Sequence, residues 1–394
     1  MKKIRYIHRK IEKILKKRTQ EFPAILITGP RQTGKSTLLR KTFDSFNYVS
    51  LDSPIQREIA INDPMSFLET NQTPLIIDEI QYAPNILPYI KIIIDENRAK
   101  TGQFILTGSQ FFPLMQGVTE TLAGRISINE LLGFSLEEIL SQKTKPLDCF
   151  RLIYKGWFPD VSLEKVEVGP FYDSYLKTYL ERDLRQVASV KDLLLFQNFI
   201  ELIAARTANI LNLNEIAKEC GISHTTAQKW LSILASGRIV FLLRPYFKNT
   251  SKRVIKSPKL YFIDTGLVSY ILKYPSPETL YNGAIRGAIF ETFVVTEILK
   301  YKLNHSSVLE MYFFRDSNHN EVDLIIEYGE NKILIEIKAT STPSLNHCKN
   351  IKKLSHLFNA SKAYLITLYP EKVQLEKGII NIPWNRISEI FRNL

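Results

Sequence analysis

The first third of the chain alternates short apolar runs with longer segments in which apolar residues recur at helical spacing. The first run, residues 24–28, leads into a glycine-containing loop and then into a helical pattern. Further short runs cover residues 47–51, 75–77 and 104–106. Strands that alternate with helices in this way build a parallel sheet with helices on its faces. The pattern predicts an α/β domain over residues 20–140.

Beyond residue 140 the pattern becomes mainly helical and then reaches a compact basic region, residues 211–263. Within this region, residues 213–234 predict two helices joined by a tight turn at Gly221. Two apolar runs behind them predict strands that flank a basic loop. A helix-turn-helix followed by such a wing is typical of a winged helix, so we expect a helical and winged-helix domain over residues 141–273.

Prolines and an Asn-Gly pair between residues 274 and 283 predict a linker. After it, residues 285–303 predict a long amphipathic helix. Strands are expected near residues 308–315, 322–328 and 332–339, followed by a helix and another strand. These elements predict a second α/β domain over residues 274–394.

Composition places the chain among ordinary globular proteins, because its 394 residues are 45% hydrophobic and 23% charged. No uncharged apolar stretch reaches the roughly 18 residues of a membrane span. The three cysteines, Cys149, Cys220 and Cys348, are far apart and odd in number, so neither a disulfide framework nor a zinc site is predicted. We expect a protein of the reducing cytoplasm without a membrane segment.

The net charge of +12 is concentrated in two regions. No acidic residue occurs between Glu219 and Asp264, where eight Lys and Arg residues lie. Residues 2–18 hold nine Lys and Arg residues against the single Glu12, and they predict an amphipathic basic helix within a separate N-terminal segment, residues 1–19. Such fields favour nucleic acid as a partner, since Lys and Arg bind phosphates. For the N-terminal helix, plain solubility is the alternative.

The loop after the first apolar run carries the strongest chemical motif, because it matches GxxxxGK[ST], the Walker A pattern. In such a loop the backbone N–H groups and the helix N-terminus surround the phosphates. Lys35 is expected to reach the β- and γ-phosphates and Ser36 to bind Mg²⁺. The residues expected to hold the nucleotide are Gly29, Pro30, Arg31, Gln32, Thr33, Gly34, Lys35, Ser36 and Thr37.

A second motif supports nucleotide binding. Residues 74–79, PLIIDE, form an apolar strand that ends in two carboxylates, as a Walker B strand does. Asp78 is expected to hold Mg²⁺ through its water shell, and Glu79 to polarise the attacking water. A solvated strand end is the alternative interpretation. The two motifs together predict ATP and Mg²⁺ as cofactors.

Two further residues are candidates for contacts with the phosphates. The strand at residues 104–110 ends in Ser109 and Gln110, and either could sense the γ-phosphate, with a simple turn as the alternative. Arg125 could stabilise transition-state charge in its own chain or from a neighbouring subunit, with an ordinary surface role as the alternative. Action from a neighbouring subunit would require a homo-oligomer.

Taken in order, GPRQTGKST, YVSLDSP, PLIIDEIQ, ILTGS and LAGRI resemble the AAA-type ATPases of bacteria and archaea that end in a restriction-endonuclease-like domain of unknown function. The resemblance covers nearly the whole chain, and the two Walker motifs are its most specific part. Residues 131–139, LLGFSLEEI, depart from the PLSF that the family often has, and the departure touches no catalytic position. The resemblance implies ATP binding and leaves the cellular role undefined.

The basic middle region predicts a nucleic-acid surface, with DNA as the first candidate. The second helix of the helix-turn-helix would present polar side chains to base edges while the wing holds phosphates. The residues in the helix are His224, Thr225, Gln228 and Lys229, and those in the wing are Lys252, Arg253 and Lys256. Winged helices also bind proteins, so a protein partner is the alternative.

The C-terminal domain carries a constellation that resembles the PD-(D/E)xK nucleases. Asp323 lies on one predicted strand, Glu336 and Lys338 share a face of the next, and Glu291 lies on the long helix. In such a site Glu291, Asp323 and Glu336 would bind Mg²⁺, and Lys338 would orient water or stabilise the scissile phosphate. A half-exposed edge strand is the alternative, and a nuclease-like fold does not establish cleavage.

The leading hypothesis is a cytoplasmic, Mg²⁺-dependent ATPase that binds DNA through a winged helix and processes it at the C-terminal site. The second is a regulatory ATPase whose two later domains dock protein partners and cleave nothing. A kinase built on the same phosphate loop is a third hypothesis, and the second Walker carboxylate and the downstream domains argue against it.

Overall fold

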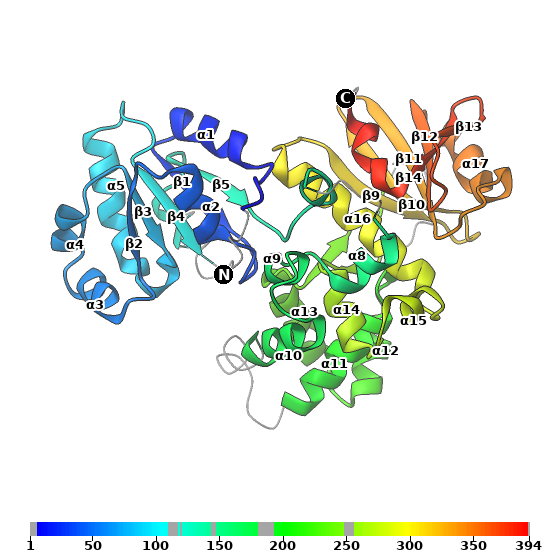
Figure 1. Cartoon of the computed structure of the whole chain (residues 1–394), viewed down its shortest axis with the longest axis horizontal. Coiled ribbons are helices and arrows are strands. Elements are labelled where there is room, and N and C mark those ends of the chain that lie inside the picture. Colours follow the sequence, from blue (N-terminus) through cyan, green and yellow to red (C-terminus); the bar gives the residue numbers. More distant parts are fainter. Residues whose placement is uncertain are drawn as a thin grey trace. The chain divides into compact units, whose positions relative to one another are not determined.

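The computed structural model describes residues 6–108, 117–118, 120–142, 147–179, 193–247 and 256–392. The chain divides into two compact units, one made mainly of the residues up to Phe134 and the other mainly of those from Ser135 on. The predicted winged-helix and C-terminal domains therefore share one unit. Figure 1 follows the chain through both units by colour.

The first unit is built on a five-stranded sheet in the order β2-β3-β4-β1-β5, in which all neighbouring strands are parallel. Its strands are β1 (Ala24–Thr28), β2 (Asn47–Ser50), β3 (Leu75–Asp78), β4 (Phe104–Gly108) and β5 (Ile126–Glu130). The expected α/β fold is confirmed for this part of the chain. Because the strands are parallel, their carboxyl ends share one edge of the sheet, and the segments that follow β1 and β3 begin there.

Helices cover both faces of this sheet (Figure 1). They are α1 (Glu12–Glu21), α2 (Lys35–Thr42), α3 (Pro54–Asn62), α4 (Pro64–Thr70) and α5 (Leu87–Glu96). Ile25 and Ile27 of β1 pack in one core with residues of α1 and α2, whereas Leu26 packs in another with residues of α3, α4 and α5. The central strands β1, β3 and β4 are buried on both faces, which is why they are largely apolar runs in the sequence, whereas β2 and β5 at the edges of the sheet keep polar residues.

The N-terminal segment is part of this first unit. Its described helix begins at Glu12, residues 6–9 before it are not helical, and Ile7, Arg9 and Ile11 are buried. Glu12 accepts hydrogen bonds from the Tyr6 hydroxyl at 2.8 Å and from the Arg9 backbone N–H at 2.7 Å. The segment therefore turns inward and packs, instead of presenting one basic helix to a partner.

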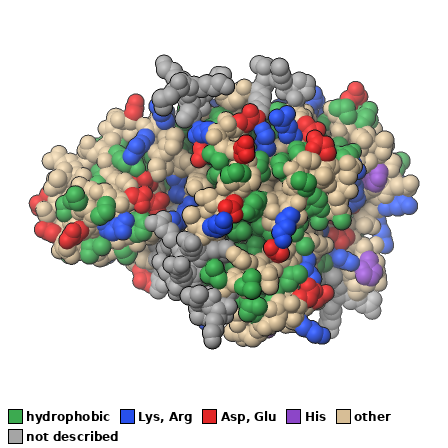
Figure 2. Space-filling view, turned by 60° about the horizontal axis from the view of Figure 1, so that its bottom comes forward, with side chains coloured by type: hydrophobic (Ala, Val, Ile, Leu, Met, Phe, Trp, Pro, Cys, Tyr) green, Lys and Arg blue, Asp and Glu red, His purple; other side chains and the backbone are tan. Residues whose placement is uncertain are grey.

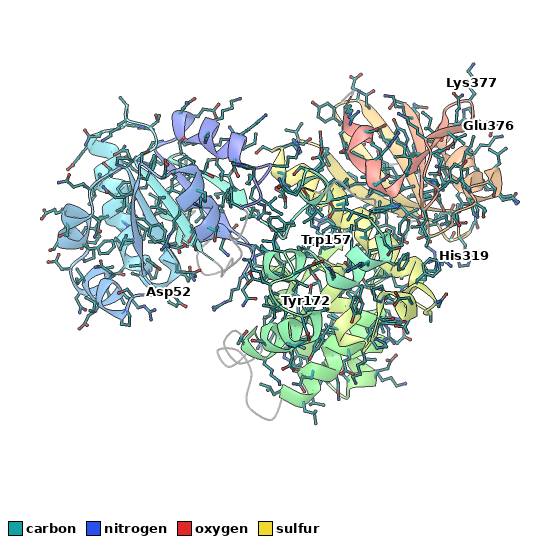
Figure 3. All side chains as sticks on the ribbon, viewed as in Figure 1. Asp52, Trp157, Tyr172, His319, Glu376 and Lys377 are labelled. Atoms are coloured by element: carbon teal, nitrogen blue, oxygen red, sulfur yellow. The ribbon has the colours of Figure 1, made fainter. Side chains whose placement is uncertain are left out.

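The first part of the second unit is helical. Its helices are α7 (Leu136–Leu140), α8 (Cys149–Lys155), α9 (Pro159–Ser162), α10 (Val168–Tyr179), α11 (Leu193–Ala205), α12 (Leu213–Cys220), α13 (His224–Ser236), α14 (Thr265–Ile271) and α15 (Pro277–Tyr281). Asp264 joins several of them, since it accepts from the Leu267 N–H at the start of α14, from the Trp157 N–H and from the Tyr172 hydroxyl. Figure 3 labels Trp157 and Tyr172 within this helical body.

Helices α12 and α13 form the expected helix-turn-helix. Gly221 ends α12 in the left-handed conformation, with φ of 68°, which glycine adopts without strain. A three-stranded antiparallel sheet follows in the order β6-β8-β7. Its strands are β6 (Asn209–Ile210), β7 (Val240–Leu243) and β8 (Lys259–Phe262). The loop between β7 and β8 holds the predicted wing, and residues 248–255 lie outside the described residues.

The last part of the chain forms a six-stranded mixed sheet in the order β13-β14-β12-β11-β10-β9. Its strands are β9 (Glu310–Arg315), β10 (Glu321–Tyr328), β11 (Asn331–Lys338), β12 (Lys362–Thr367), β13 (Val373–Glu376) and β14 (Ile379–Pro383). The helices of this part are α16 (Arg286–Asn304) and α17 (Lys349–Phe358), and α17 packs on the core of the sheet.

The predicted linker at residues 274–283 is folded. It contains α15, which Ser276 caps, and the Leu280 side chain is fully buried. The two parts that it was expected to separate are also joined by backbone hydrogen bonds, from the Tyr246 N–H to the Phe313 carbonyl at 2.7 Å and from the Phe313 N–H to the Arg244 carbonyl at 3.1 Å. These bonds explain why the two predicted domains fold as one unit.

Candidate functional site

The phosphate loop lies between β1 and α2, at the carboxyl edge of the parallel sheet. Gly29, Gln32 and Gly34 have φ values of 139°, 61° and 88°, so the backbone turns repeatedly through conformations that favour glycine. A Cβ on Gly29 would lie 2.1 Å from the Leu131 carbonyl oxygen. The glycines thus permit a tight turn between β1 and α2.

Lys35 is buried in this loop. Its ammonium donates to the Gly29 carbonyl at 2.9 Å and to the Pro30 carbonyl at 2.8 Å. Burial lowers the pKa of Lys35 to about 8, and the neighbouring carboxylates of Glu79 and Asp78 partly oppose that effect. A phosphate at the loop would offer the ammonium stronger partners than two neutral carbonyls do.

Asp78 ends β3 and is held by two hydroxyl groups. The Tyr48 hydroxyl donates to Asp78 Oδ2 at 2.5 Å, and the Thr107 hydroxyl donates to Oδ1. Thr107 also accepts a hydrogen bond from the Glu79 backbone N–H at 3.1 Å, so its hydroxyl links the Asp78 carboxylate and the Glu79 backbone to β4. Glu79 has a φ of 60°, a left-handed conformation that turns the chain sharply after the strand. These contacts fix the Asp78 carboxylate and the backbone of Glu79.

The residues at this edge fit a magnesium ion. The Ser36 hydroxyl and the Asp78 carboxylate are the hard oxygen ligands that Mg²⁺ prefers, next to the loop where phosphates would supply further oxygens. Two hydroxyl donors keep Asp78 oriented without adding a competing positive charge.

Tyr48 and Thr107 were not among the expected site residues. Thr107 had a signal in the sequence, because it is a polar residue near the end of the apolar strand β4, which pairs with β3. Tyr48 had none, since its strand, NYVS, has polar residues at both ends. The residues that were expected at the end of β4, Ser109 and Gln110, lie outside the described residues. The sensing role of these two stays a prediction.

Arg125 lies at the wrong edge of the sheet for a role in its own chain. It precedes β5, and its carbonyl accepts from the Ala24 N–H at the start of β1, whereas the phosphate loop follows the other end of that strand. The five residues of β1 span about 13 Å at 3.3 Å per residue. Arg125 instead forms a two-bond pair with Asp95, through Nε at 2.6 Å and Nη2 at 3.0 Å. This position is compatible with the ordinary surface role and with action from a neighbouring subunit, but not with catalysis in its own chain.

Arg9 supports the phosphate loop from behind. Its buried guanidinium donates to the Thr33 carbonyl at 2.9 Å, the Leu132 carbonyl at 2.8 Å and the Gly133 carbonyl at 3.1 Å, and it lies over the Phe134 ring. These bonds join the loop to the segment that leaves the sheet after β5. In the sequence Arg9 was one of several basic residues, and nothing marked it as different.

The four predicted base-reading residues share one exposed face. Exposed side chains of α13 include those of His224, Thr225, Gln228 and Lys229, whereas the neighbouring Ala227 and Trp230 are buried. In the wing, Lys256 is exposed, and Lys252 and Arg253 lie outside the described residues. On the face shown in Figure 2, Lys and Arg side chains are interspersed with Asp and Glu side chains. Among the four predicted base-reading residues of α13, Lys229 alone is a lysine or arginine, so this face is polar and weakly charged.

The predicted nuclease residues come together, and two lysines lie among them. Lys338 contacts Glu336 at 2.6 Å and Asp323 at 3.4 Å, and Asp323 also accepts from the Ile337 N–H at 2.8 Å. Lys259 of β8, which was expected on the basic surface, is instead buried against Glu291 at 3.0 Å. In the sequence, Lys259 and Tyr261 alternate with apolar residues in β8. Because alternate residues of a strand point to the same face, this pattern indicated that one face of β8 carries polar groups.

The predicted magnesium ligands of this C-terminal site do not fit a metal as they are placed. Within the described ranges, no group of three or more His, Cys, Asp or Glu side chains could hold a metal ion. Burial raises the pKa of Glu291 to about 7 against the opposing effect of Lys259, and burial with the charge of Asp323 raises the pKa of Glu336 to about 8. The physical reason is that ammonium groups, not open space, lie between the carboxylates.

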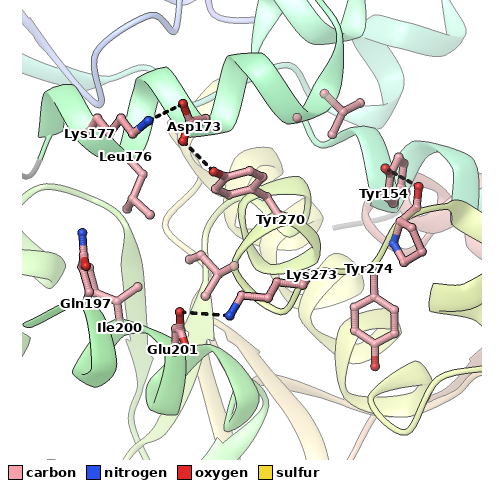
Figure 4. A pocket seen from close by; sticks show the side chains of 14 residues that line it. Tyr154, Asp173, Leu176, Lys177, Gln197, Ile200, Glu201, Tyr270, Lys273 and Tyr274 are labelled. Carbon is pink, nitrogen blue, oxygen red and sulfur yellow. Dashed lines mark hydrogen bonds and ion pairs between the residues drawn. The ribbon is translucent and has the colours of Figure 1, made fainter. Parts of the chain in front are cut away.

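A pocket of about 490 Å³ lies between α10, α11 and α14 in the helical part of the second unit (Figure 4). Its charged side chains are paired with one another. Asp173 accepts from the Tyr270 hydroxyl at 2.9 Å and pairs with Lys177 at 2.8 Å, while Lys273 lies 3.7 Å from Glu201. We assign no ligand to this pocket.

Comparison with known families divides the chain into three parts. The AAA domain profile matches residues 21–140, and two profiles of domains of unknown function, DUF8612 and DUF4143, match residues 147–278 and 286–387. An uncharacterised protein of Mycobacterium tuberculosis and one of Mycobacterium bovis are each 28% identical over 379 residues, which are 95% of this chain and 82% of the relative.

Among solved structures, the Walker-type ATPase of Pyrococcus abyssi matches with 16% identity and a TM-score of 0.41, over 66% of this chain and 94% of that one. No described helix has the length and apolarity needed to cross a membrane. The parallel sheet, the phosphate loop with its paired carboxylates, and the match to the AAA domain together make residues 21–140 a P-loop ATPase domain.

Proposed function

We propose that this protein is a cytoplasmic, Mg²⁺-dependent ATPase that binds DNA through a winged helix formed by α12, α13 and the sheet of β6, β7 and β8. The observation that carries the DNA part is the exposed face of α13, where His224, Thr225, Gln228 and Lys229 stand clear of the core. The cytoplasmic assignment is supported by three free, buried cysteines.

In the ATPase domain each residue has a role that its position supports. The loop N–H groups and Lys35 bind the phosphates, and Ser36 and Asp78 would hold Mg²⁺, which supplies charge neutralisation between the phosphates when bound. Tyr48 and Thr107 orient Asp78. Glu79 accepts a proton from the attacking water. Replacement of Lys35 by Ala removes the ammonium and should abolish nucleotide binding.

The DNA assignment rests on charge as well as on exposure. The chain from residue 220 to residue 263 contains no acidic residue, so α13 approaches a phosphate backbone without local repulsion from its own segment. Base contacts would come from Gln228 and phosphate contacts from Lys229 and the wing.

The test is a pair of charge reversals measured by fluorescence anisotropy with a labelled duplex at several salt concentrations. Lys229→Glu should weaken DNA binding at least tenfold. The plot of log affinity against log salt concentration should become less steep, by the amount expected for the loss of about one phosphate contact or more. The control is Lys377→Glu, which changes an exposed lysine beside Glu376 in the turn between β13 and β14 (Figure 3). Equal affinity of the two variants would refute the assignment to α13.

A second assay links the two activities. ATP hydrolysis is measured with and without duplex DNA at low salt, with Lys35→Ala as the blank. Stimulation by DNA would support an ATP switch that acts on bound DNA. An ATP hydrolysis rate that is the same with and without DNA would support the second candidate, a regulatory ATPase whose later domains bind protein partners.

The C-terminal domain enters the proposal as a restriction-endonuclease-like fold. Its support is the convergence of Asp323, Glu336 and Lys338 on neighbouring strands. We derive no cleavage step from it, because the described arrangement does not fit Mg²⁺. A homo-oligomer is part of the proposal only if Arg125 leaves Asp95 and acts on a neighbouring subunit's nucleotide.

A further inference from the structure

The C-terminal carboxylate cluster contains a lysine from outside its own sheet. Lys259 is the first residue of β8, which belongs to the antiparallel sheet of the helix-turn-helix, and its side chain is 4% exposed. Its ammonium lies 3.0 Å from Glu291, 2.5 Å from Glu321 and 3.8 Å from Asp323. A buried ammonium is tolerated only with such partners, so the carboxylates and the amine stabilise one another.

The remaining contacts of the cluster leave little freedom. The Tyr261 hydroxyl, two residues along the same strand, donates to Glu291 at 2.7 Å. Asp323 is fixed on its other oxygen by the Ile337 N–H. Lys259 is also held by its backbone, because it pairs with Leu243 of β7 in the strand register. The amine is therefore built into the cluster by the fold and does not reach it as a flexible surface side chain.

The position of Lys259 matters because Glu291 and Asp323 are two of the carboxylates that a divalent cation would need. The ammonium contacts an oxygen of each, in the space between them. A metal bound by the same two carboxylates would lie beside this buried positive charge, and the two would repel strongly in a poorly screened environment. Glu336 keeps one buried oxygen, Oε2, without a hydrogen-bond partner.

We propose that the ammonium of Lys259 is the resident cation of this cluster, that it excludes divalent metal from Glu291 and Asp323, and that its removal converts the cluster into a site for Mg²⁺ or Mn²⁺. The inference rests on the proposed restriction-endonuclease-like arrangement of the C-terminal domain. It does not depend on ATP hydrolysis or on DNA binding by α13. In this proposal β8 has two roles. It is a strand of the small antiparallel sheet, and it supplies the positive charge that balances the carboxylates of Glu291, Glu321 and Asp323.

The test titrates the full-length protein with Mn²⁺ in the absence of nucleotide and counts bound ions by electron paramagnetic resonance. Wild type and Asp323→Asn should bind equally, because Asp323 contributes no metal site while Lys259 is present. Lys259→Met, which keeps the length and removes the charge, should gain one site. That site should disappear in Lys259→Met combined with Asp323→Asn. Lys259→Arg keeps a cation in place and should gain none.

Two results would overturn the inference. One is a Mn²⁺ site in wild type that Asp323→Asn removes, and the other is a folded Lys259→Met that gains no site. If Lys259→Met fails to fold, Mn²⁺ during refolding should restore it, and an absence of rescue would count against the proposal. ATP hydrolysis and duplex binding of the same variants are measured in parallel, so a failure of the proposed function is seen separately from a failure at the cluster.

Discussion

Replacement of Gly29 by alanine tests how tightly the phosphate loop is packed. The new Cβ would lie 2.1 Å from the Leu131 carbonyl oxygen and 3.0 Å from its carbon, so the backbone of Leu131 must retreat by about 1 Å. That retreat is resisted, because the Leu131 N–H donates to the Thr28 carbonyl at 2.8 Å and the Leu131 side chain is fully buried.

The cost has two parts. Overpacking against a fixed backbone costs about 1–3 kcal/mol, and a φ of 139° adds about 1–2 kcal/mol for a residue with a Cβ. We expect Gly29→Ala to lose about 2–5 kcal/mol of unfolding free energy. Gly124→Ala is the matched control, since Gly124 also has a positive φ, of 74°, but no atom lies within 4 Å of the place that a Cβ would occupy. It should lose only the conformational part, about 1–2 kcal/mol.

Urea denaturation of the wild type and both variants gives the two differences. Unfolding is followed by far-UV circular dichroism, because all three tryptophans lie in the second unit and would not report on the unit that holds Gly29 and Gly124. Binding of a fluorescent ADP analogue is measured on the same samples, and Gly29→Ala should lose it while Gly124→Ala keeps it. The reasoning fails if the two variants are equally stable, because the clash at Leu131 would then cost nothing.

Three further predictions concern the same domain. Tyr48→Phe removes a hydroxyl that donates to Asp78 at 2.5 Å, so kcat for ATP should fall about tenfold while ADP affinity stays within about twofold, and an unchanged kcat would refute the orienting role. Arg9→Met leaves three carbonyls without their donor and should cost about 2–4 kcal/mol in urea denaturation, whereas a change below about 0.5 kcal/mol would show that water replaces the guanidinium. Burial lowers the pKa of Lys35 to about 8, so the amine is mostly neutral above that pH, and phosphate binding favours its charged form. ADP binding should therefore take up protons at pH 8.5 and hardly any at pH 7, as calorimetry in two buffers can show, and equal uptake at both pH values would contradict the shift.

The sequence predicts the central strands of the parallel sheet well because β1, β3 and β4 are buried on both faces, whereas the edge strand β5, with an exposed position, was not predicted. Runs such as residues 24–28 and 75–77 have no polar position in their interior, and the observed β1 and β3 match them within one residue. The Walker carboxylates follow from the same local pattern. Local sequence patterns were sufficient for these residues because the phosphate loop and the Walker carboxylates come directly after β1 and β3.

Long-range placement is where the sequence was not sufficient. Arg125 was a candidate for catalysis, but its location at the amino end of β5 follows from the strand order of the whole sheet. Lys259 looked like one more basic residue in an acid-free stretch, and its burial depends on Glu291 and Glu321, which are 32 and 62 positions further along the chain. The inward turn at Arg9 likewise depends on carbonyls more than 100 residues away.

The anchoring of Arg9 has a consequence for where this ATPase domain can be cut. The family profile begins at residue 21, so a fragment made to that boundary would lack Arg9, Ile11 and Leu15. Such a fragment would expose one face of β1 to water and leave the carbonyl of Thr33 unsatisfied. The smallest autonomous folding fragment should therefore start no later than residue 6, and a biochemist who trims the chain at the profile boundary should expect an aggregating protein, not an inactive one.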